Sequence, residues 1–292
     1  MIPAAAAAGQ HLPFANDLWA PLLAGAVHKL DALLEQLDLR PADVAADPGN
    51  PFPIRVPQPY LDRMQRGNPQ DPLLRQVLPL LAERTITQGL SEDPLQEHSA
   101  VAAPGLLHKY HGRALVVTTG ACAVHCRYCF RRHFPYADHG PAHYPALLAK
   151  VKADPTIGEV ILSGGDPLAL SDNALEALVD QLVSVPHVQR LRIHTRLPIV
   201  IPQRMNQRLV AYLQGLPIPV VMVVHANHAN ELDALTQRAF AALHHPNVHL
   251  LNQSVLLRGV NDSAQHLREL SLTLFKQGVL PYYLHMTDAV QG

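Results

Sequence analysis

The sequence is short of cysteine, of net charge and of long apolar runs, and each shortage excludes a class of protein. Three cysteines in 292 residues make a poor disulfide framework, so we expect a reducing, cytoplasmic location. Lys plus Arg number 23 against 24 Asp plus Glu, and this balance gives no reason to expect a nucleic-acid or anionic membrane surface. No apolar run reaches the roughly 18 residues of a membrane span. The opening segment, MIPAAAAAGQHLPF, lacks the basic n-region of a signal peptide.

The three cysteines, Cys122, Cys126 and Cys129, lie together in the segment CAVHCRYC. A redox pair of Cys126 and Cys129 would leave Cys122 unexplained, whereas three thiolates can converge on one metal site. Three ligands at this spacing suit three corners of a 4Fe–4S cluster and leave the fourth iron open to another ligand. A zinc site with His125 or His133 as fourth ligand is the alternative. Zinc motifs commonly have a second arm of ligands, which is missing here.

From about residue 113 onward, apolar β-branched runs alternate with helical patterns. The starts of successive runs are separated by 45, 31, 29, 29 and 32 residues, which is the spacing of βαβ units. The segments 171–185 and 261–278 predict helices between strands, and strands that are apolar on both faces predict a sheet covered by helices. A partial barrel and a doubly wound sheet both fit this pattern. The six predicted strands are 114–119, 159–164, 190–196, 219–226, 248–256 and 280–286.

Before this region the sequence predicts irregular helices joined by proline-rich connections. We therefore divide the chain into an N-terminal helical and extended region, 1–112, and a β/α region, 113–292. An apolar stripe predicts a helix over 18–38, and Asp71 with Pro72 suits the N-cap and first position of another.

Polar residues follow each of the six predicted strands. Ligands of parallel β/α folds bind at the carboxyl ends of the strands, so we expect these residues to share one polar mouth. A single polar strand end is an ordinary turn, but six in succession favour a binding site. Besides the cysteines and the Ser163–Asp166 segment, we expect this mouth to be lined by His194, His225, Asn252, Gln253 and Ser254.

Several long motifs resemble those of the lysine 2,3-aminomutase family of radical S-adenosylmethionine enzymes. They are CRYCFRRHFPY, SGGDPL, RLRIHTRLPIV, HANHANE and LLNQSVLLRGVND, with RVPQPYLDRMQRGNPQDPLLRQVLP and PGLLHKYHGRAL upstream. The resemblance covers nearly the whole chain and is greatest to the bacterial branch that prepares β-lysine for elongation factor P. It implies a partial (β/α)6 barrel after an N-terminal helical region. It also implies an isomerase that moves the lysine amino group from C2 to C3, using a 4Fe–4S cluster, S-adenosylmethionine, pyridoxal 5′-phosphate and a one-electron reductant.

The same resemblance assigns roles to matching positions. Arg131 would bind the substrate carboxylate and Asp288 the side-chain ammonium of lysine. Arg113 would contact the phosphate of pyridoxal phosphate, with Lys109 as a weaker candidate. The cluster ligands would be Cys122, Cys126 and Cys129, and the S-adenosylmethionine contacts Ser163, Gly164, Gly165 and Asp166.

The sequence departs from the family at its C-terminal end. The family anchors pyridoxal phosphate through a lysine after the sixth strand, whereas this sequence stops at LHMTDAVQG, and Lys276 lacks the surrounding motif. We therefore expect a truncated chain, without the last βα segment, that binds a cluster and fails to retain pyridoxal phosphate. Two alternatives stay open: a radical aminomutase acting on another amino acid, and a non-catalytic cluster-binding or zinc-binding form.

Overall fold

A computed structural model describes residues 12–292, so predictions about the first eleven residues lie outside the described part. Its eight-stranded sheet follows chain order from β1 to β8. β2 is antiparallel to both of its neighbours, β1 and β3, and the strands from β3 to β8 are parallel to one another. A doubly wound sheet would reverse its order at a switch point, so the sequential order identifies a partial β/α barrel. Within 12–292, β3 and β8 do not pair, and the barrel is open.

The six predicted strands are confirmed, with boundaries that differ by at most one residue. They correspond to β3 (Arg113–Thr119), β4 (Glu159–Gly164), β5 (Arg190–Thr195), β6 (Val220–His225), β7 (Val248–Val255) and β8 (Leu280–His285). The two short strands β1 (Val101–Ala103) and β2 (Leu106–Tyr110) were not predicted. β1 has three residues, and the turn to β2 contains Pro104 and Gly105, so this segment resembles a loop. The predicted boundary at residues 112 and 113 lies between β2 and β3, which pair in one sheet.

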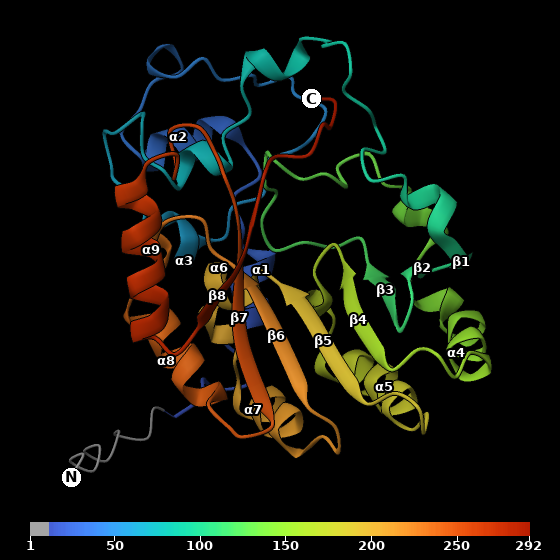
Figure 1. The fold of residues 1–292 in the computed structure, drawn as a ribbon. Helices are drawn as coiled ribbons and strands as arrows, with labels where there is room; N and C mark the ends of the chain where they lie inside the picture. Colours follow the sequence, from blue (N-terminus) through green and yellow to red (C-terminus); the bar gives the residue numbers. More distant parts are fainter. Residues whose placement is uncertain (1–11) are drawn as a thin grey trace.

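Helices connect the parallel strands and lie along one side of the curved sheet (Figure 1). The predicted helices 171–185 and 261–278 are confirmed as α5 and α9. Four of the helices begin at a side-chain cap, in which Ser171, Asn206, Asp233 or Ser263 accepts a backbone N–H. The helices are α4 (Tyr144–Ala153), α5 (Asp172–Val183), α6 (Leu197–Val200), α7 (Gln207–Gly215), α8 (Ala234–Leu243) and α9 (Ala264–Lys276).

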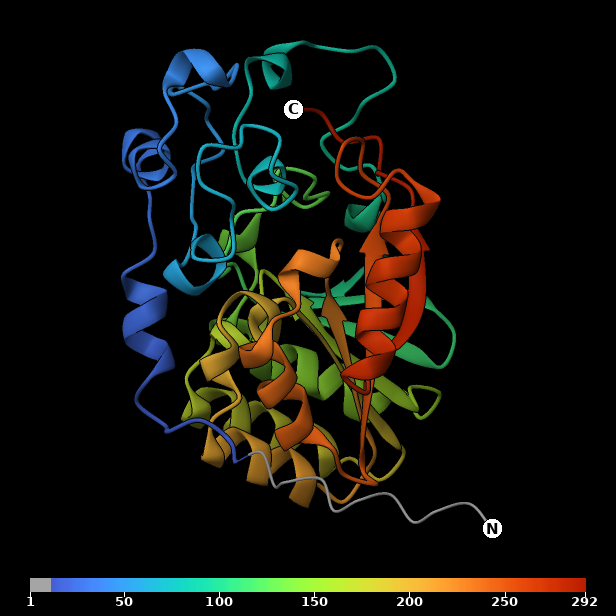
Figure 2. The same cartoon turned by 90° about the vertical axis from the view of Figure 1, so that its left-hand side faces the viewer.

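The N-terminal region lies over the carboxyl ends of the strands, with the C-terminus beside it (Figures 1 and 2). The predicted helix over 18–38 is divided at Gly25 into α1 (Trp19–Ala24) and α2 (Leu30–Gln36), and α3 (Gln58–Leu61) follows. Asp71 does cap the next turn, since its Oδ1 accepts the N–H groups of Leu73 and Leu74 at 2.8 and 2.9 Å. That turn continues only as a 3₁₀ turn rather than as the predicted α-helix. The 3₁₀ turns are η1 (Pro41–Asp43), η2 (Leu74–Gln76), η3 (Leu81–Arg84), η4 (Glu97–Ala100), η5 (Tyr136–Asp138), η6 (Pro141–His143), η7 (Pro167–Ala169), η8 (Pro202–Arg204) and η9 (Ala229–Glu231).

One hydrophobic core holds both regions together. Its buried members include Leu33 and Leu73 from the N-terminal region and Val160, Ile193 and Val224 from the sheet. At the far edge, β8 is exposed, with Tyr283 and Leu284 in contact with solvent. Across the described residues, no helix is both long enough and apolar enough to cross a membrane.

Candidate functional site

The three cysteines lie in the loop between β3 and η5, at the carboxyl end of the first parallel strand. All three are half-buried free thiols. Two backbone hydrogen bonds tie this loop to the N-terminal region: the N–H of His125 donates to the carbonyl of Arg55 at 3.1 Å, and that of Arg127 to Gln76 at 2.9 Å. The loop has no regular secondary structure, so these contacts fix its position.

The glycines of the S-G-G-D segment hold the cysteine loop from the other side. The N–H of Gly165 donates to the carbonyl of Thr119 at 2.6 Å, and that of Asp166 to Ala121 at 2.8 Å. A Cβ at Gly165 would lie 2.8 Å from the carbonyl carbons of Gly120 and Ala121, which is far inside van der Waals contact. Glycine is therefore required because the segment packs directly against the start of the cysteine loop.

Asp166 is buried, and protein groups already use both of its carboxylate oxygens. Oδ1 accepts from the Leu168 N–H at 3.0 Å and the Thr195 hydroxyl at 2.7 Å. Oδ2 accepts from the N–H groups of Arg196 at 2.7 Å and Leu197 at 3.1 Å. Burial raises the pKa of Asp166 above its ordinary value. The side chain thus joins the ends of β4 and β5, and its predicted contact with an ammonium group stays a prediction.

Burial makes two of the three thiols, Cys122 and Cys129, harder to ionise. Burial and the neighbouring thiols raise the pKa of Cys122, and burial with the charge of Cys126 raises that of Cys129 to about 11. Metal binding would therefore release protons from these thiols. No three His, Cys, Asp or Glu side chains within residues 12–292 converge closely enough to hold one ion.

The two histidines of the zinc alternative have other partners. The Nδ1 of His125 lies 2.9 Å from the carbonyl of Pro53, and its ring stacks on Phe52. The Nε2 of His133 lies 2.8 Å from the carbonyl of Gln291. Each contact uses one ring nitrogen and leaves the other, the Nε2 of His125 or the Nδ1 of His133, as a possible ligand. The preference for three thiolates on a cluster therefore rests on the spacing of the cysteines.

Arg131 lies in the cysteine loop, two residues after Cys129, and its guanidinium is buried. Its Nε and Nη2 donate to the two carboxylate oxygens of Glu97 at 2.7 and 2.6 Å. Its Nη1 donates to the hydroxyl of Ser163 at 2.9 Å. This fork holds the carboxylate of Glu97 bidentately, and its contact with a substrate carboxylate stays a prediction. Sequence reasoning missed Glu97, which lies in η4 and carries no motif that marks it.

Asp288 lies in the tail after β8, close to the same site. The tail pairs with the N-terminal region, because the N–H of Ser91 donates to the carbonyl of Ala289 at 2.9 Å and Gln291 returns a bond to Ser91 at 3.0 Å. Burial raises the pKa of Asp288, His285 opposes this shift, and the charge of Glu97 adds to it. The Nε2 of His133, in the cysteine loop, lies 2.8 Å from the carbonyl of Gln291, so the tail that carries Asp288 reaches the loop that carries Arg131.

The predicted phosphate contacts lie elsewhere. Arg113 begins β3, six residues before Thr119, which places it about 20 Å along the strand from the end that leads to the cysteines. Its guanidinium stacks on the ring of Tyr110 at 4.7 Å. Lys109 is exposed and donates to the carbonyl of Leu95 at 3.0 Å. The structure therefore does not bring these two residues to the cysteine loop.

The other strand-end residues divide into two groups. Asn252 and Ser254 are buried and bind the backbone of Ala226, so they join the ends of β6 and β7. His194 and His225 lie on neighbouring strands with ring centroids 6.4 Å apart, and Gln253 hydrogen-bonds the His225 ring. Burial, with the charges of Arg192 and Arg131, lowers the pKa of His194 to about 3. Burial and the neighbouring His194 also lower the pKa of His225, so both imidazoles are neutral at physiological pH.

A buried polar network next to Cys126 was also missed. Arg196, directly after β5, donates from Nη1 to the Sγ of Cys126 at 2.7 Å. Its Nη2 donates to Glu231 at 2.9 Å and to Gln76 at 2.6 Å. These four residues are far apart in the sequence, so no local pattern could have grouped them.

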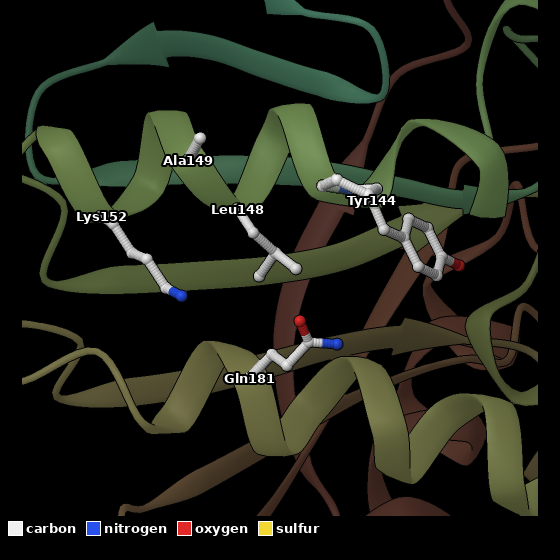
Figure 3. A pocket seen from close by; sticks show the side chains of 6 residues that line it. Tyr144, Leu148, Ala149, Lys152 and Gln181 are labelled. Atoms are coloured by element: carbon white, nitrogen blue, oxygen red, sulfur yellow. The ribbon is translucent and has the colours of Figure 1, made fainter.

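Two surface depressions lie away from these residues. One of about 290 Å³ lies between α4 and α5, where Gln181 faces side chains of α4 (Figure 3). Another, of about 330 Å³, includes residues of β2 and α4. Neither is lined by a cysteine or by any predicted site residue. The first is lined by Tyr144, Pro145, Leu148, Ala149, Lys152 and Gln181.

An open β/α barrel whose first parallel strand leads into a loop with three cysteines at the spacing CxxxCxxC defines an iron–sulfur protein of the radical S-adenosylmethionine class. Comparisons agree. Residues 111–192 match the family described as a 4Fe-4S single cluster domain. The L-lysine 2,3-aminomutase of Escherichia coli is 50% identical over 279 residues, covering 94% of this chain and 81% of that protein. That of Haemophilus influenzae is 48% identical over 281 residues, covering 94% and 82%. The enzyme of the same name from Clostridium subterminale is 37% identical over 236 residues, covering 80% and 56%. The chain belongs to the L-lysine 2,3-aminomutase family, whose members are isomerases.

Proposed function

We propose that this chain carries out the radical rearrangement of (S)-α-lysine to β-lysine. The observation that carries the proposal is the arrangement at the carboxyl end of the sheet. There, a loop with three free thiols lies next to an arginine fork already holding a carboxylate, and a second acidic side chain lies nearby. Lysine has a carboxylate at one end and an ammonium at the other, and these charges match Arg131 and Asp288.

Cys122, Cys126 and Cys129 are the proposed ligands of the 4Fe–4S cluster. When bound, the cluster supplies the electron that cleaves S-adenosylmethionine, with its open iron as the binding point. The chain's own contribution is to hold the thiols at fixed positions, through the carbonyls of Arg55 and Gln76 on one side and the Gly165 segment on the other. Ser163, Gly164, Gly165 and Asp166 are proposed to shape the adjoining S-adenosylmethionine site.

Arg131 is proposed to orient the substrate through its carboxylate. Glu97 occupies the same fork, so the substrate carboxylate must displace Glu97 or share the guanidinium with it. Asp288 is proposed to bind the side-chain ammonium. Glutamate would place a second carboxylate near Asp288 and Glu97, where like charges repel, which argues against it as substrate.

Pyridoxal phosphate is the proposed third cofactor, but the described residues do not fit its covalent attachment. The phosphate contact that we propose, Arg113, lies at the other end of β3. Every lysine between residues 12 and 292 is exposed, on the N-terminal region, β2, α4 or α9, and none lies at the carboxyl end of the sheet. We therefore derive no step through this group.

The proposed setting is the cytoplasm, with a one-electron reductant as partner and β-lysine supplied for modification of elongation factor P. The near-neutral charge balance supports a small-molecule substrate rather than nucleic acid. The proposed division into 1–112 and 113–292 gives the first region the role of covering the site. Its carbonyl contacts with the cysteine loop support that role.

Metal analysis and a product assay test the proposal. After anaerobic reconstitution, we expect about four iron and four sulfide per chain, against one zinc for the alternative site. Cys126→Ala should abolish iron binding, and iron content that survives this change would contradict the ligand assignment. With S-adenosylmethionine, pyridoxal phosphate and a reductant, lysine should yield β-lysine. Turnover of glutamate or arginine in its place would favour another amino acid as substrate, and an intact cluster without turnover would favour the non-catalytic form.

A further inference from the structure

The guanidinium of Arg196 lies against the thiol of Cys126. Its Nη1 donates to Sγ at 2.7 Å, and its side chain is 6% exposed. A charged donor is thus aimed at a sulfur in a place from which water is largely excluded. Electrostatic interactions are strongest in such surroundings, because solvent does not screen them.

Several further contacts hold the Arg196 guanidinium in this position. Its Nη2 donates to Glu231, Gln76 and the hydroxyl of Tyr60 at 2.9, 2.6 and 3.2 Å. It also stacks against the rings of Tyr60 and Tyr128, with centroid distances of 5.4 and 5.6 Å. The guanidinium therefore cannot turn away from the sulfur without breaking several buried contacts.

Glu231 is the counter-charge of this arrangement. It is fully buried, and its Oε1 accepts from the N–H groups of Asn227 at 2.7 Å and His228 at 3.0 Å. The amide of Gln76 donates to the same oxygen at 3.1 Å. All three donors point at one carboxylate oxygen, and the guanidinium of Arg196 contacts the other. A fixed positive charge therefore contacts the sulfur, and a fixed negative charge lies directly behind it.

We propose that Arg196 is a positioning residue that raises the reduction potential of the cluster through Cys126, and that Glu231 moderates this effect. Reduction adds an electron to the cluster. A positive donor on a ligand sulfur stabilises the more negative, reduced form, and a nearby carboxylate destabilises it. The inference rests on the proposed ligand role of Cys126. It deepens the proposed function by assigning residues that set how readily the cluster accepts an electron.

Two variants with opposite predicted signs test the inference. The full chain is reconstituted without S-adenosylmethionine, and the reduced cluster is followed by electron paramagnetic resonance in a potentiometric titration. Arg196→Gln should lower the midpoint reduction potential of the cluster. At a fixed potential, the ratio of reduced to oxidised cluster should be at least tenfold smaller, which is equivalent to about 59 mV for one electron. Glu231→Gln should raise the midpoint. Arg196→Lys keeps the charge and should lie between Arg196→Gln and the unchanged chain.

Arg204 provides a matched control. It is as fully buried, its Nη1 lies 2.6 Å from Asp172, and it has no contact with a cysteine. Arg204→Gln removes a buried, paired guanidinium and should leave the midpoint unchanged.

An unchanged midpoint in Arg196→Gln with full iron and sulfide content would overturn the inference, as would a lower midpoint in Glu231→Gln. If Arg196→Gln does not fold, the other two variants test the inference: the midpoint should rise in Glu231→Gln and fall in Arg196→Lys, and an unchanged midpoint in both would overturn it. Failure of the unchanged chain to assemble a cluster would instead overturn the ligand assignment, so the two failures are distinguishable.

Discussion

Replacing Gly165 with alanine tests whether the glycine segment holds the cysteine loop by direct backbone contact. The added Cβ would lie 2.8 Å from two carbonyl carbons, those of Gly120 and Ala121, and closer still to the Ala121 carbonyl oxygen. All of these are backbone atoms, which cannot rotate away. Gly165 does not have a positive φ, so backbone strain contributes nothing and the effect is steric.

Two results are expected from Gly165→Ala. Forcing extra volume into a packed site destabilises a protein by about 1–3 kcal/mol. At about 2–4 °C per kcal/mol for a domain of this order of size, the Tm of the apo-protein should fall by several degrees. Since Ala121 directly precedes Cys122, relief of the clash would also move a ligand, so iron content after reconstitution should fall.

Gly215→Ala is the matched control. Gly215 ends α7, and its added Cβ would meet nothing within 4 Å. Alanine is the better helix former, so we expect a gain of about 0.5–1 kcal/mol and full iron content. Both variants are compared by anaerobic thermal unfolding followed by circular dichroism and by iron analysis. A Gly165→Ala protein with the original Tm and iron content would refute the reasoning, and so would an equal loss in Gly215→Ala.

Three further predictions concern the proposed substrate and cofactor groups. Arg131→Lys loses the bidentate fork. A charged hydrogen bond contributes about 1.5–3 kcal/mol, so the KM for lysine should rise about 10- to 150-fold. Arg132, whose guanidinium contacts Glu83 at 3.0 Å, has no proposed substrate contact, so Arg132→Lys should change the KM little. Because burial raises the pKa of Asp288, kcat/KM for lysine should fall as pH drops through a value above that of an ordinary aspartate. Asp288→Asn should raise KM and remove this acid limb from the pH profile. Borohydride treatment with pyridoxal phosphate, followed by peptide mass spectrometry, should label no lysine of residues 12–292 stoichiometrically, and full labelling of one lysine would contradict this.

The sheet could be predicted from sequence because its physical signal is local. β6 is VVMVVH, and all but its last residue are buried, so an apolar run marks both the strand and its coverage on two faces. The cysteine loop was found for the same reason, since its three thiols lie within one short segment. β1 was not predicted, because its three residues are too short a run to mark a strand.

The contacts that hold the site together could not be predicted, because they join residues distant in sequence. Glu97 and Arg131 are 34 positions apart, and Arg196 and Gln76 are 120 apart. Asp166 shows the same limit in another way. Its motif indicated a ligand contact, yet its four hydrogen bonds come from one group after β4 and three at or after the end of β5, which only the folded chain brings together.

The distribution of these contacts bears on the role of the N-terminal region. The cysteine loop depends on carbonyls of Arg55 and Gln76, Arg131 on the carboxylate of Glu97, and Arg196 on the side chains of Gln76 and Tyr60. All four acceptor residues precede residue 113, although every predicted site residue except Lys109 follows that boundary. A β/α region by itself would leave Arg131 without the carboxylate of Glu97, and an unpaired buried charge is strongly destabilising. Arg196 would keep Glu231 but lose Gln76 and Tyr60. The N-terminal region is therefore part of the site's structure as well as its cover. For this reason the motifs of the β/α region identify the proposed ligand residues but not the residues that hold them in place.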